Sequence, residues 1–301
     1  MPAKKNAPGK RTMMGRNQTT AGRIFDALNH GFLGLTALIM VAPLLYVIIG
    51  SFSATGQLGK HFTPSLNAYQ MIFASGKVPT SLGNSFVITL AGTAINIAMT
   101  SMTAYVLSKK LLPGRKLFMS VVIFFMLFSA GLIPDYMVVV NQYKLGDTFL
   151  AIWLPVAISS SNLIIMKNFF QQLPESIEES ARIDGCNELQ SFLRIVLPMS
   201  KASIATFSLF YAVGHWNNYL RPLIYLDTPG KWPVTVWLRQ VVILSLGGMG
   251  ADNLSEMDSV WAATDAVKYA TIVVSTLPII CVYPFLQKHF AKGVLLGSVK
   301  G

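Results

Sequence analysis

Stretches without a charged residue divide the chain into pieces of membrane-spanning length. A helix rises 1.5 Å per residue and needs about 20 mostly apolar residues to cross the hydrocarbon layer, where only helices and closed barrels satisfy their backbone hydrogen bonds. Six charge-free runs hold 33, 31, 18, 19, 19 and 19 residues. The pattern predicts an all-α membrane protein with six transmembrane helices, over residues 28–49, 84–108, 117–134, 148–166, 202–226 and 269–286.

Composition and charge distribution agree with a membrane protein. The chain of 301 residues is 52% hydrophobic and 12% charged, whereas soluble domains carry about 25% charged residues. A net charge of +11 could indicate nucleic-acid binding, but a cytoplasmic amino terminus followed by six spans places 17 of the 24 Lys and Arg on the cytoplasmic side. This asymmetry follows the positive-inside rule. We therefore expect both termini in the cytoplasm and no nucleic-acid partner.

The spans divide the chain into a short arm, a membrane domain and a tail. Residues 1–22 form a basic, polar arm, expected in the cytoplasm at the lipid surface. The transmembrane domain covers 23–290, and the tail covers 291–301. Between spans 4 and 5 lies the largest cytoplasmic segment, 167–201, and residues 227–267 form an outer loop.

A short helix is predicted within the segment 167–201. Ser176 followed by Glu179 fits a capping box, which places the first helical residue at Ile177. Gly185 stands where a left-handed residue ends a helix. Such a short helix is unstable alone and must pack against something. The residues leave open whether this is its own membrane domain or a partner protein.

Glu178 and Arg182 stand four residues apart, in the order that favours an ion pair along the helix. Pro174 and Pro198 separate this helix from spans 4 and 5.

This segment resembles a known motif. Glu179-Ser180-Ala181, Gly185 and Ile195-Val196-Leu197-Pro198 are similar to the EAA loop of importer-type ABC transporter permeases, with matching spacing and Ser180 in place of the usual Ala. Supporting stretches are Ala104–Leu107, Pro113–Lys116, Asn162–Phe170, His215–Asn218 and Gly297–Gly301. The chain is thus identified as a member of the carbohydrate-uptake subfamily that includes the maltose, lipo-oligosaccharide and alginate permeases.

The resemblance implies a type I importer fold, in a bacterial inner membrane, with a coupling helix between spans 4 and 5. The helix docks into a cytoplasmic ATPase subunit, and the carboxy-terminal tail provides a second contact. Implied partners are a second, homologous permease in a heterodimer, two ATPase subunits, an extracytoplasmic solute-binding protein and the lipid bilayer. The implied coupling residues are Ser176, Glu179, Ala181, Asp184 and Gly185, and the implied tail contacts are Gly297, Val299, Lys300 and Gly301.

The chain lacks the sequence pattern of an ATPase. A P-loop requires Gly-x-x-x-x-Gly-Lys followed by Ser or Thr. The four Gly-Lys pairs are followed by Arg11, His61, Val78 and Trp232. We expect no enzymatic activity and no cofactor or metal on this chain, with ATP and Mg held by the partner ATPase subunits.

One cluster in span 5 is a candidate for the substrate path. Tyr211, His215, Trp216, Asn218 and Tyr219 have helical spacing, and aromatic faces with amide donors suit sugar rings. Packing within the protein, or an aromatic belt at the membrane interface, explains the same residues equally well.

The resemblance implies that the outer loop faces the binding protein, with Trp232, Trp237, Asp252 and Glu256 as the expected contacts. From the residues alone, a plain solvated loop explains the same composition.

The absence of charge in the span interiors bears on the mechanism of transport. Ion-coupled carriers keep acidic groups inside the membrane, and these spans have none in their interiors. The absence of such groups disfavours an ion-coupled carrier. The resemblance then implies a permease subunit of an ATP-driven importer that moves a carbohydrate, expected to be an oligosaccharide and, in the lipo-oligosaccharide and alginate branch, a larger or acidic one. The alternatives are an ATP-independent channel or carrier, and then a membrane-embedded enzyme, which would need a clustered set of reactive groups.

Overall fold

The computed structural model describes residues 20–56, 62–245 and 265–298. Within these ranges the secondary structure is helical apart from one isolated bridge between Ser53 and Pro64, so the all-α prediction is confirmed. Most of the basic arm 1–22, much of the outer loop and the last three residues lie outside the described residues.

Helix α1 (Thr20–Ser51) contains the first predicted span. Up to Tyr46 it belongs to a compact unit of its own, and residues 47–301 form a second unit. Residues Gly22–Ser51 form a candidate membrane span, and the 32 residues of the helix give a length of about 48 Å, enough to cross a bilayer.

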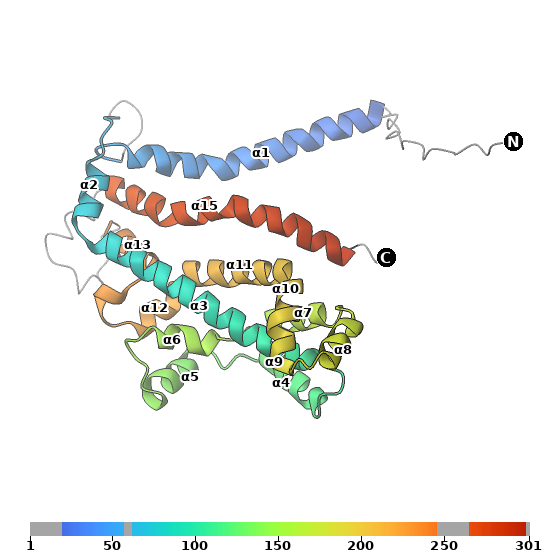
Figure 1. Cartoon of the computed structure of the whole chain (residues 1–301). Helices are drawn as coiled ribbons and strands as arrows, with labels where there is room; N and C mark the ends of the chain where they lie inside the picture. The colour runs from blue at the N-terminus through green and yellow to red at the C-terminus, as the bar shows by residue number, and fades with distance from the viewer. Residues whose placement is uncertain (1–19, 57–61, 246–264, 299–301) are drawn as a thin grey trace. The chain divides into compact units, whose positions relative to one another are not determined.

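The second unit is organised around α3 (Lys77–Ser108), an unbroken helix of 32 residues. Helices α11 (Lys201–Asn217), α7 (Ser160–Phe170) and α13 (Val234–Ser245) pack along it (Figure 1). Its buried residues include a row of small or polar side chains three or four positions apart, which lets neighbouring helices approach closely. These residues are Ser81, Ser85, Thr89, Gly92, Asn96, Thr100 and Ala104.

Helix α15 (Asp265–Ser298) contains the last predicted span and packs against α11, α13 and the short helix α2 (Asn67–Ala74). At one end of this arrangement, Ala266 and Ala270 of α15 lie buried against Ala68 and Ile72 of α2.

The third and fourth predicted spans are bent, and the helix that contains the start of the fifth is preceded by a bend between Met199 and Lys201. The described residues include three helices long and apolar enough to cross a membrane, or up to six if each bent pair is one span. The bends are 115°, 54° and 85°. The corresponding pairs are α4 (Arg115–Leu127) with α5 (Leu132–Tyr136) and η1 (Met137–Gln142); α6 (Leu150–Trp153) and η2 (Leu154–Val156) with α7; and α9 (Glu188–Ser191), η3 (Phe192–Val196) and α10 (Leu197–Met199) with α11.

The structure corrects two helix boundaries. The helix predicted over 117–134 ends at Leu127, and Gly131, with φ of 90°, lies at the turn that follows. The helix predicted over 202–226 ends at Asn217, and α12 (Leu220–Tyr225) continues the chain as a separate element. The predicted outer loop also contains the short 3-10 turn η4 (Pro229–Lys231) and α13. Uncharged composition alone does not distinguish a straight helix from two joined ones.

The contact between α3 and α11 depends on a glycine. A methyl group at Gly92 would lie 2.6 Å from Nε2 of His215, and that nitrogen is also 2.6 Å from Oδ1 of Asn96. The imidazole therefore fills the space that a side chain at position 92 would occupy.

We predict that Gly92→Ala lowers the stability of the protein by about 1–3 kcal/mol, because overpacking forces buried neighbours to shift. Gly83→Ala, in the same helix, is the matched control, since its methyl group would meet nothing within 4 Å. Thermal unfolding in detergent, followed by size-exclusion chromatography, measures both. Equal melting temperatures for the two variants would contradict the packing argument.

Candidate functional site

The segment with the EAA-like motif forms helix α8 (Glu175–Ile183), two residues longer at its start than predicted. Pro174 precedes the helix, and the start has no side-chain cap, so the predicted capping box of Ser176 and Glu179 is wrong. The carbonyl of Ser176 instead accepts a hydrogen bond from Oγ of Ser180, at 2.9 Å. Pro174 has φ of −61° and ψ of 123°, an extended backbone that proline readily adopts.

The capping box of this segment lies one helix later. The side chain of Asn187 accepts the backbone N–H of Gln190 at 2.8 Å, and the Gln190 side chain accepts the N–H of Asn187 at 3.0 Å. This capping box stands at the start of α9, which follows α8 after a short turn.

The predicted end of this short helix at Gly185 is confirmed. Gly185 has φ of 83°, in the left-handed region that favours glycine. Its N–H donates to the carbonyl of Arg182 at 3.1 Å, and the N–H of Cys186 donates to the carbonyl of Ala181 at 2.9 Å. These are the two bonds of a Schellman motif, which satisfies carbonyls at the helix end.

Helix α8 has a packed face and an exposed face. Ala181 is buried, at 4% exposure, and Glu178 is partly buried. Ser176, Glu179 and Asp184 are exposed, and Ile183 is 85% exposed. Glu179 and Ile183 are four positions apart and therefore share one face of the helix. This exposed face offers a carboxylate and an apolar side chain to a partner.

Ion pairs hold the packed face of α8 against the end of α3. Glu178 pairs with Lys109, the residue that follows α3, so the predicted pair between Glu178 and Arg182 is wrong. Arg182 instead pairs with Glu188 at 2.6 Å, and Glu188 raises the pKa of this guanidinium. The sequence could not reveal these pairs, because their partners come from α3 and α9.

A second, exposed pair joins the same two segments. Nζ of Lys110 lies 2.6 Å from Oε1 of Glu175, and this contact lowers the pKa of the carboxyl group.

The predicted substrate-path residues separate into two groups. Tyr211, His215 and Trp216 are buried at the inner side of α11. Asn218 and Tyr219 follow the end of α11, and Tyr219 is 46% exposed. The structure therefore does not bring the five residues together on one helical face.

The buried members of this cluster have partners within the protein. The Tyr211 hydroxyl lies 2.7 Å from Oγ1 of Thr100 and accepts the N–H of Ser159 at 3.4 Å. Nε1 of Trp216 donates to the carbonyl of Ser275 at 3.2 Å. In this arrangement their polar atoms connect helices of the same chain.

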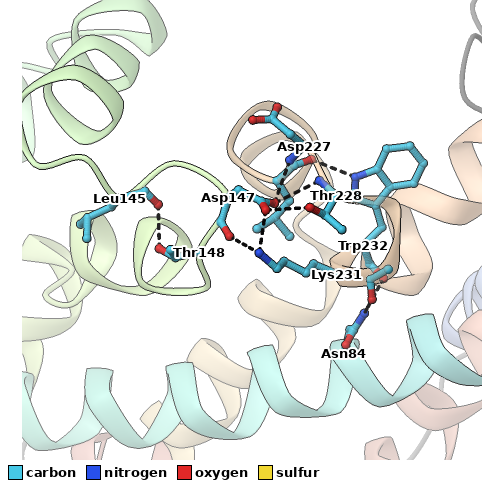
Figure 2. Close-up of polar contacts among 10 residues, drawn as sticks. Asn84, Leu145, Asp147, Thr148, Asp227, Thr228, Lys231 and Trp232 are labelled. Atoms are coloured by element: carbon cyan, nitrogen blue, oxygen red, sulfur yellow. Dashed lines mark hydrogen bonds and ion pairs between the residues drawn. The ribbon is translucent and has the colours of Figure 1, made fainter.

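At the opposite end of α3, a polar network fixes the turn η4 (Figure 2). Asp147 accepts the backbone N–H groups of Asp227 and Thr228 at 3.1 and 3.0 Å, and the Thr228 hydroxyl at 2.7 Å. Lys231 donates to the carboxylate of Asp147 at 2.6 Å. The hydrogen bond from Lys231, followed by those from Thr228, holds the pKa of Asp147 well below its usual range.

Helix α3 supports the same turn from its other side. Nδ2 of Asn84 donates to the carbonyls of Gly230 and Trp232, at 2.7 and 3.2 Å. Oγ of Ser85 accepts the N–H of Val234 at 2.8 Å. We call residues Asp227–Val234 the corner turn.

One predicted binding-protein contact is corrected. Trp232 is only 7% exposed and packs with Ile88, Leu226 and Val236, so its ring is part of the protein core. Trp237 is partly buried, with Nζ of Lys77 5.3 Å from its ring centroid. The other two predicted contacts, Asp252 and Glu256, lie outside the described residues.

One of the four predicted tail contacts lies among the described residues. Gly297 belongs to α15, whereas Val299, Lys300 and Gly301 lie outside the described residues. No group of three or more residues that could hold a metal ion occurs in residues 20–56, 62–245 and 265–298.

The fold and the site define a class of protein. A helical chain with up to six candidate spans, and a short helix held by ion pairs at one end, is a multi-pass membrane protein of the ABC importer permease type. Residues 113–296 match the family model for the binding-protein-dependent transport system inner membrane component. The chain belongs to this family of transport permeases.

Known proteins of the family resemble almost the whole chain. Protein LplC of Bacillus subtilis is 49% identical over 291 residues, covering 95% of this chain and 98% of LplC. The polygalacturonan/rhamnogalacturonan transport system permease protein YtcP of the same organism is 49% identical over 286 residues, covering 93% and 99%. A crystal structure of a bacterial ABC transporter involved in the import of the acidic polysaccharide alginate matches with a TM-score of 0.82 and 30% identity, over 90% of this chain and 98% of that chain.

We predict that Asp147→Asn lowers the melting temperature, whereas Asp227→Asn does not, because Asp227 uses only its backbone N–H in the network and its carboxylate points away (Figure 2). Since the folded-state pKa of Asp147 is lowered, its stabilisation is complete above the unfolded pKa of about 3.9 and is lost as the pH falls toward the folded-state value.

The difference between the wild type and Asp147→Asn should therefore stay constant from about pH 8 to about pH 5 and shrink only below about pH 4. Thermal unfolding across this range tests it, and a difference that disappears near neutral pH would contradict the lowered pKa.

Proposed function

We propose that this chain is one of two non-identical permease subunits of a bacterial ABC importer that carries an acidic oligosaccharide into the cytoplasm. A solute-binding protein delivers the cargo, and two separate ATPase subunits supply the energy. The end of α3 next to α8, together with both termini, lies on the cytoplasmic side, in keeping with the distribution of Lys and Arg. The corner turn lies on the outer side.

The observation that carries the coupling role is the exposed face of α8. Glu179 and Ile183 project from a helix whose other face is held by Lys109 and by burial of Ala181. A short helix fixed from behind can transmit force to the chain that supports it, whereas an unsupported two-turn helix would unfold. This face, with Asp184 beside it, is the proposed contact for the ATPase.

The proposed cargo rests on similarity to permeases with carbohydrate substrates. YtcP bears the name of a polygalacturonan/rhamnogalacturonan transport system, and the matching crystal structure belongs to a transporter of alginate. Both names describe acidic polysaccharides. We therefore propose an oligosaccharide that contains uronic acids.

The importer is tested by purifying a tagged chain from its native membrane in mild detergent. Recovery of a P-loop ATPase and a second permease is the expected result. Uptake of a labelled uronic-acid oligosaccharide, compared with a neutral one of the same length, then tests the cargo. Preferential uptake of the neutral sugar would overturn the proposed acidic cargo and leave the importer assignment intact.

We predict that Gly185→Pro abolishes uptake while the protein still inserts into the membrane. Proline cannot adopt φ of 83° and removes the N–H that bonds to Arg182, which costs more than about 1 kcal/mol at the end of a short helix. Gly185→Asn is the control, because asparagine tolerates the left-handed region. Normal uptake by the proline variant would remove the coupling role of this turn.

We predict that Glu179→Lys reduces recovery of the ATPase by at least about fivefold, because it places the wrong charge at the docking face. Asp227→Lys makes the same change of charge at an exposed position in the corner turn. Quantitative mass spectrometry of the purified complexes compares the two. Equal recovery would show that the ATPase does not contact the exposed face of α8.

A further inference from the structure

We infer that Lys109 is a positioning residue that ties the coupling helix α8 to α3, so that α3 carries the movement of α8 to the corner turn. This inference rests on the proposed coupling role of α8. It adds a route through named residues, from the ATPase contact to the opposite end of the chain.

Lys109 lies at the centre of the contact between α3 and α8. Its ammonium group pairs with Glu178, lies 3.9 Å from Oε2 of Glu188, and is 4.1 Å from the centroid of the Tyr105 ring. The side chains of Lys109 and Glu178 are each 23% exposed, so this pair is shielded from water on most of its surface. A cation held by carboxylates and an aromatic face has few alternative positions.

Glu188 adds a second connection between the same elements. Its Oε2 accepts the hydroxyl of Tyr105 at 2.9 Å, and its Oε1 accepts Nη2 of Arg182 at 2.6 Å. Tyr105 belongs to α3 and Arg182 to the last turn of α8, so the carboxylate links both helices. The two connections leave from different turns of α8. The ion pair of Arg182 with Glu188 is itself exposed, at 55% and 58%. The shielded pair of Lys109 with Glu178 and the hydrogen bond from Tyr105 are therefore the stronger contacts to α3.

The neighbouring residue Lys110 provides an internal comparison. It pairs with Glu175 of the same helix, at 2.6 Å, but its side chain is 71% exposed and that of Glu175 is 69% exposed. Exposed pairs of this kind contribute little, because water and salt screen them. Lys109 and Lys110 therefore contact the same helix, but we expect only the pair of Lys109 to contribute much to the position of α8.

The other end of α3 contacts the corner turn directly. Asn84 and Ser85 hold Gly230, Trp232 and Val234 by hydrogen bonds. Between Asn84 and Lys109 the helix is unbroken and about 38 Å long, whereas the third and fourth predicted spans are bent. Figure 1 shows α3 running from the region of α13 to the region of α8 and α9.

We expect an unbroken helix that is anchored at both ends to move as one body. When an ATPase shifts α8, the Lys109 and Glu188 connections displace the end of α3, and the corner turn moves with its far end. The same route, taken in reverse, allows an event at the outer surface to change the position of α8, since coupling between two sites is reciprocal. Loss of Lys109 should then separate ATP hydrolysis from events at the outer surface.

The test uses the whole importer, with its partner permease, ATPases and binding protein, reconstituted in proteoliposomes. We expect Lys109→Met to reduce the stimulation of ATP hydrolysis by loaded binding protein by about fivefold, because Glu178 loses its partner in a shielded site. Burial of Ala181 and the hydrogen bonds of Glu188 still hold α8 in this variant, so recovery of all subunits should stay at the wild-type level. Lys110→Met is the matched control and should behave as the wild type.

A double-mutant cycle tests whether the effect of Lys109→Met comes from its pair with Glu178 or from the change in net charge. Lys109→Met combined with Glu178→Gln should be no worse than Lys109→Met alone, because both changes break one connection. Lys110→Met with Glu175→Gln should remain at the wild-type level. Tyr105→Phe, which removes only the hydroxyl bonded to Glu188, should lower stimulation in the same direction and serves if Lys109→Met does not assemble.

Two results would overturn the inference. The first is an assembled complex in which Lys109→Met and Lys110→Met give equal stimulation, or, where Lys109→Met does not assemble, in which Tyr105→Phe gives wild-type stimulation. The second is additive loss in the Lys109 and Glu178 double variant. Either result leaves the proposed importer function intact, whereas absence of an ATPase from the wild-type complex would overturn that function as well.

Discussion

Backbone and side-chain polar groups that enter a membrane need partners within the protein, and α3 supplies many of them. At the break between η2 and α7, the carbonyl of Val156 accepts Nδ2 of Asn96, and the N–H of Ser159 donates to the hydroxyl of Tyr211. Oγ1 of Thr100 lies 2.7 Å from that hydroxyl. An interrupted helix is tolerated in a membrane when neighbouring side chains satisfy the freed groups. The small polar face of α3 thus permits the bend of 54° in span 4.

The same constraint explains why His215 and Tyr211 are buried without an ionised partner. His215 bonds to Asn96, which also bonds to Val156, so one amide joins α3, α11 and the break in span 4. Each of these groups would be costly in hydrocarbon if its partner were removed. Their position is accounted for by contacts between helices. A role in cargo binding would require that these contacts open during transport.

Sequence reasoning predicted the elements well where a local pattern determines them. The charge-free runs identified the apolar segments, and Gly185 marked the end of α8 because a left-handed residue there has few alternatives. It failed where distant residues decide the outcome. Glu178 and Arg182 have the spacing of a pair within one helix. In the structure Glu178 pairs with Lys109 instead, and Arg182 pairs with Glu188. Periodicity also gave no information on bends, which depend on partners from other helices.

The position of Trp232 shows a related limit. An aromatic residue in a connecting segment is compatible with a partner surface, yet this indole donates to the carbonyl of Leu226 at 2.9 Å and is buried. The ring and the bond from Asn84 to the Trp232 carbonyl together stiffen the corner turn. Only the tertiary arrangement separates an anchor of the turn from a residue that faces a partner.

The two faces of α8 also explain the departure of its motif from the usual Glu-Ala-Ala. Position 181 is packed, so a small side chain is required there, and alanine is present. Position 180 is exposed, and the hydroxyl of Ser180 bonds to the carbonyl of Ser176 within the same helix. Such a bond occupies the polar group locally and leaves the packed face unchanged. The motif therefore preserves the residue that its packing requires and varies at a position where the structure has room.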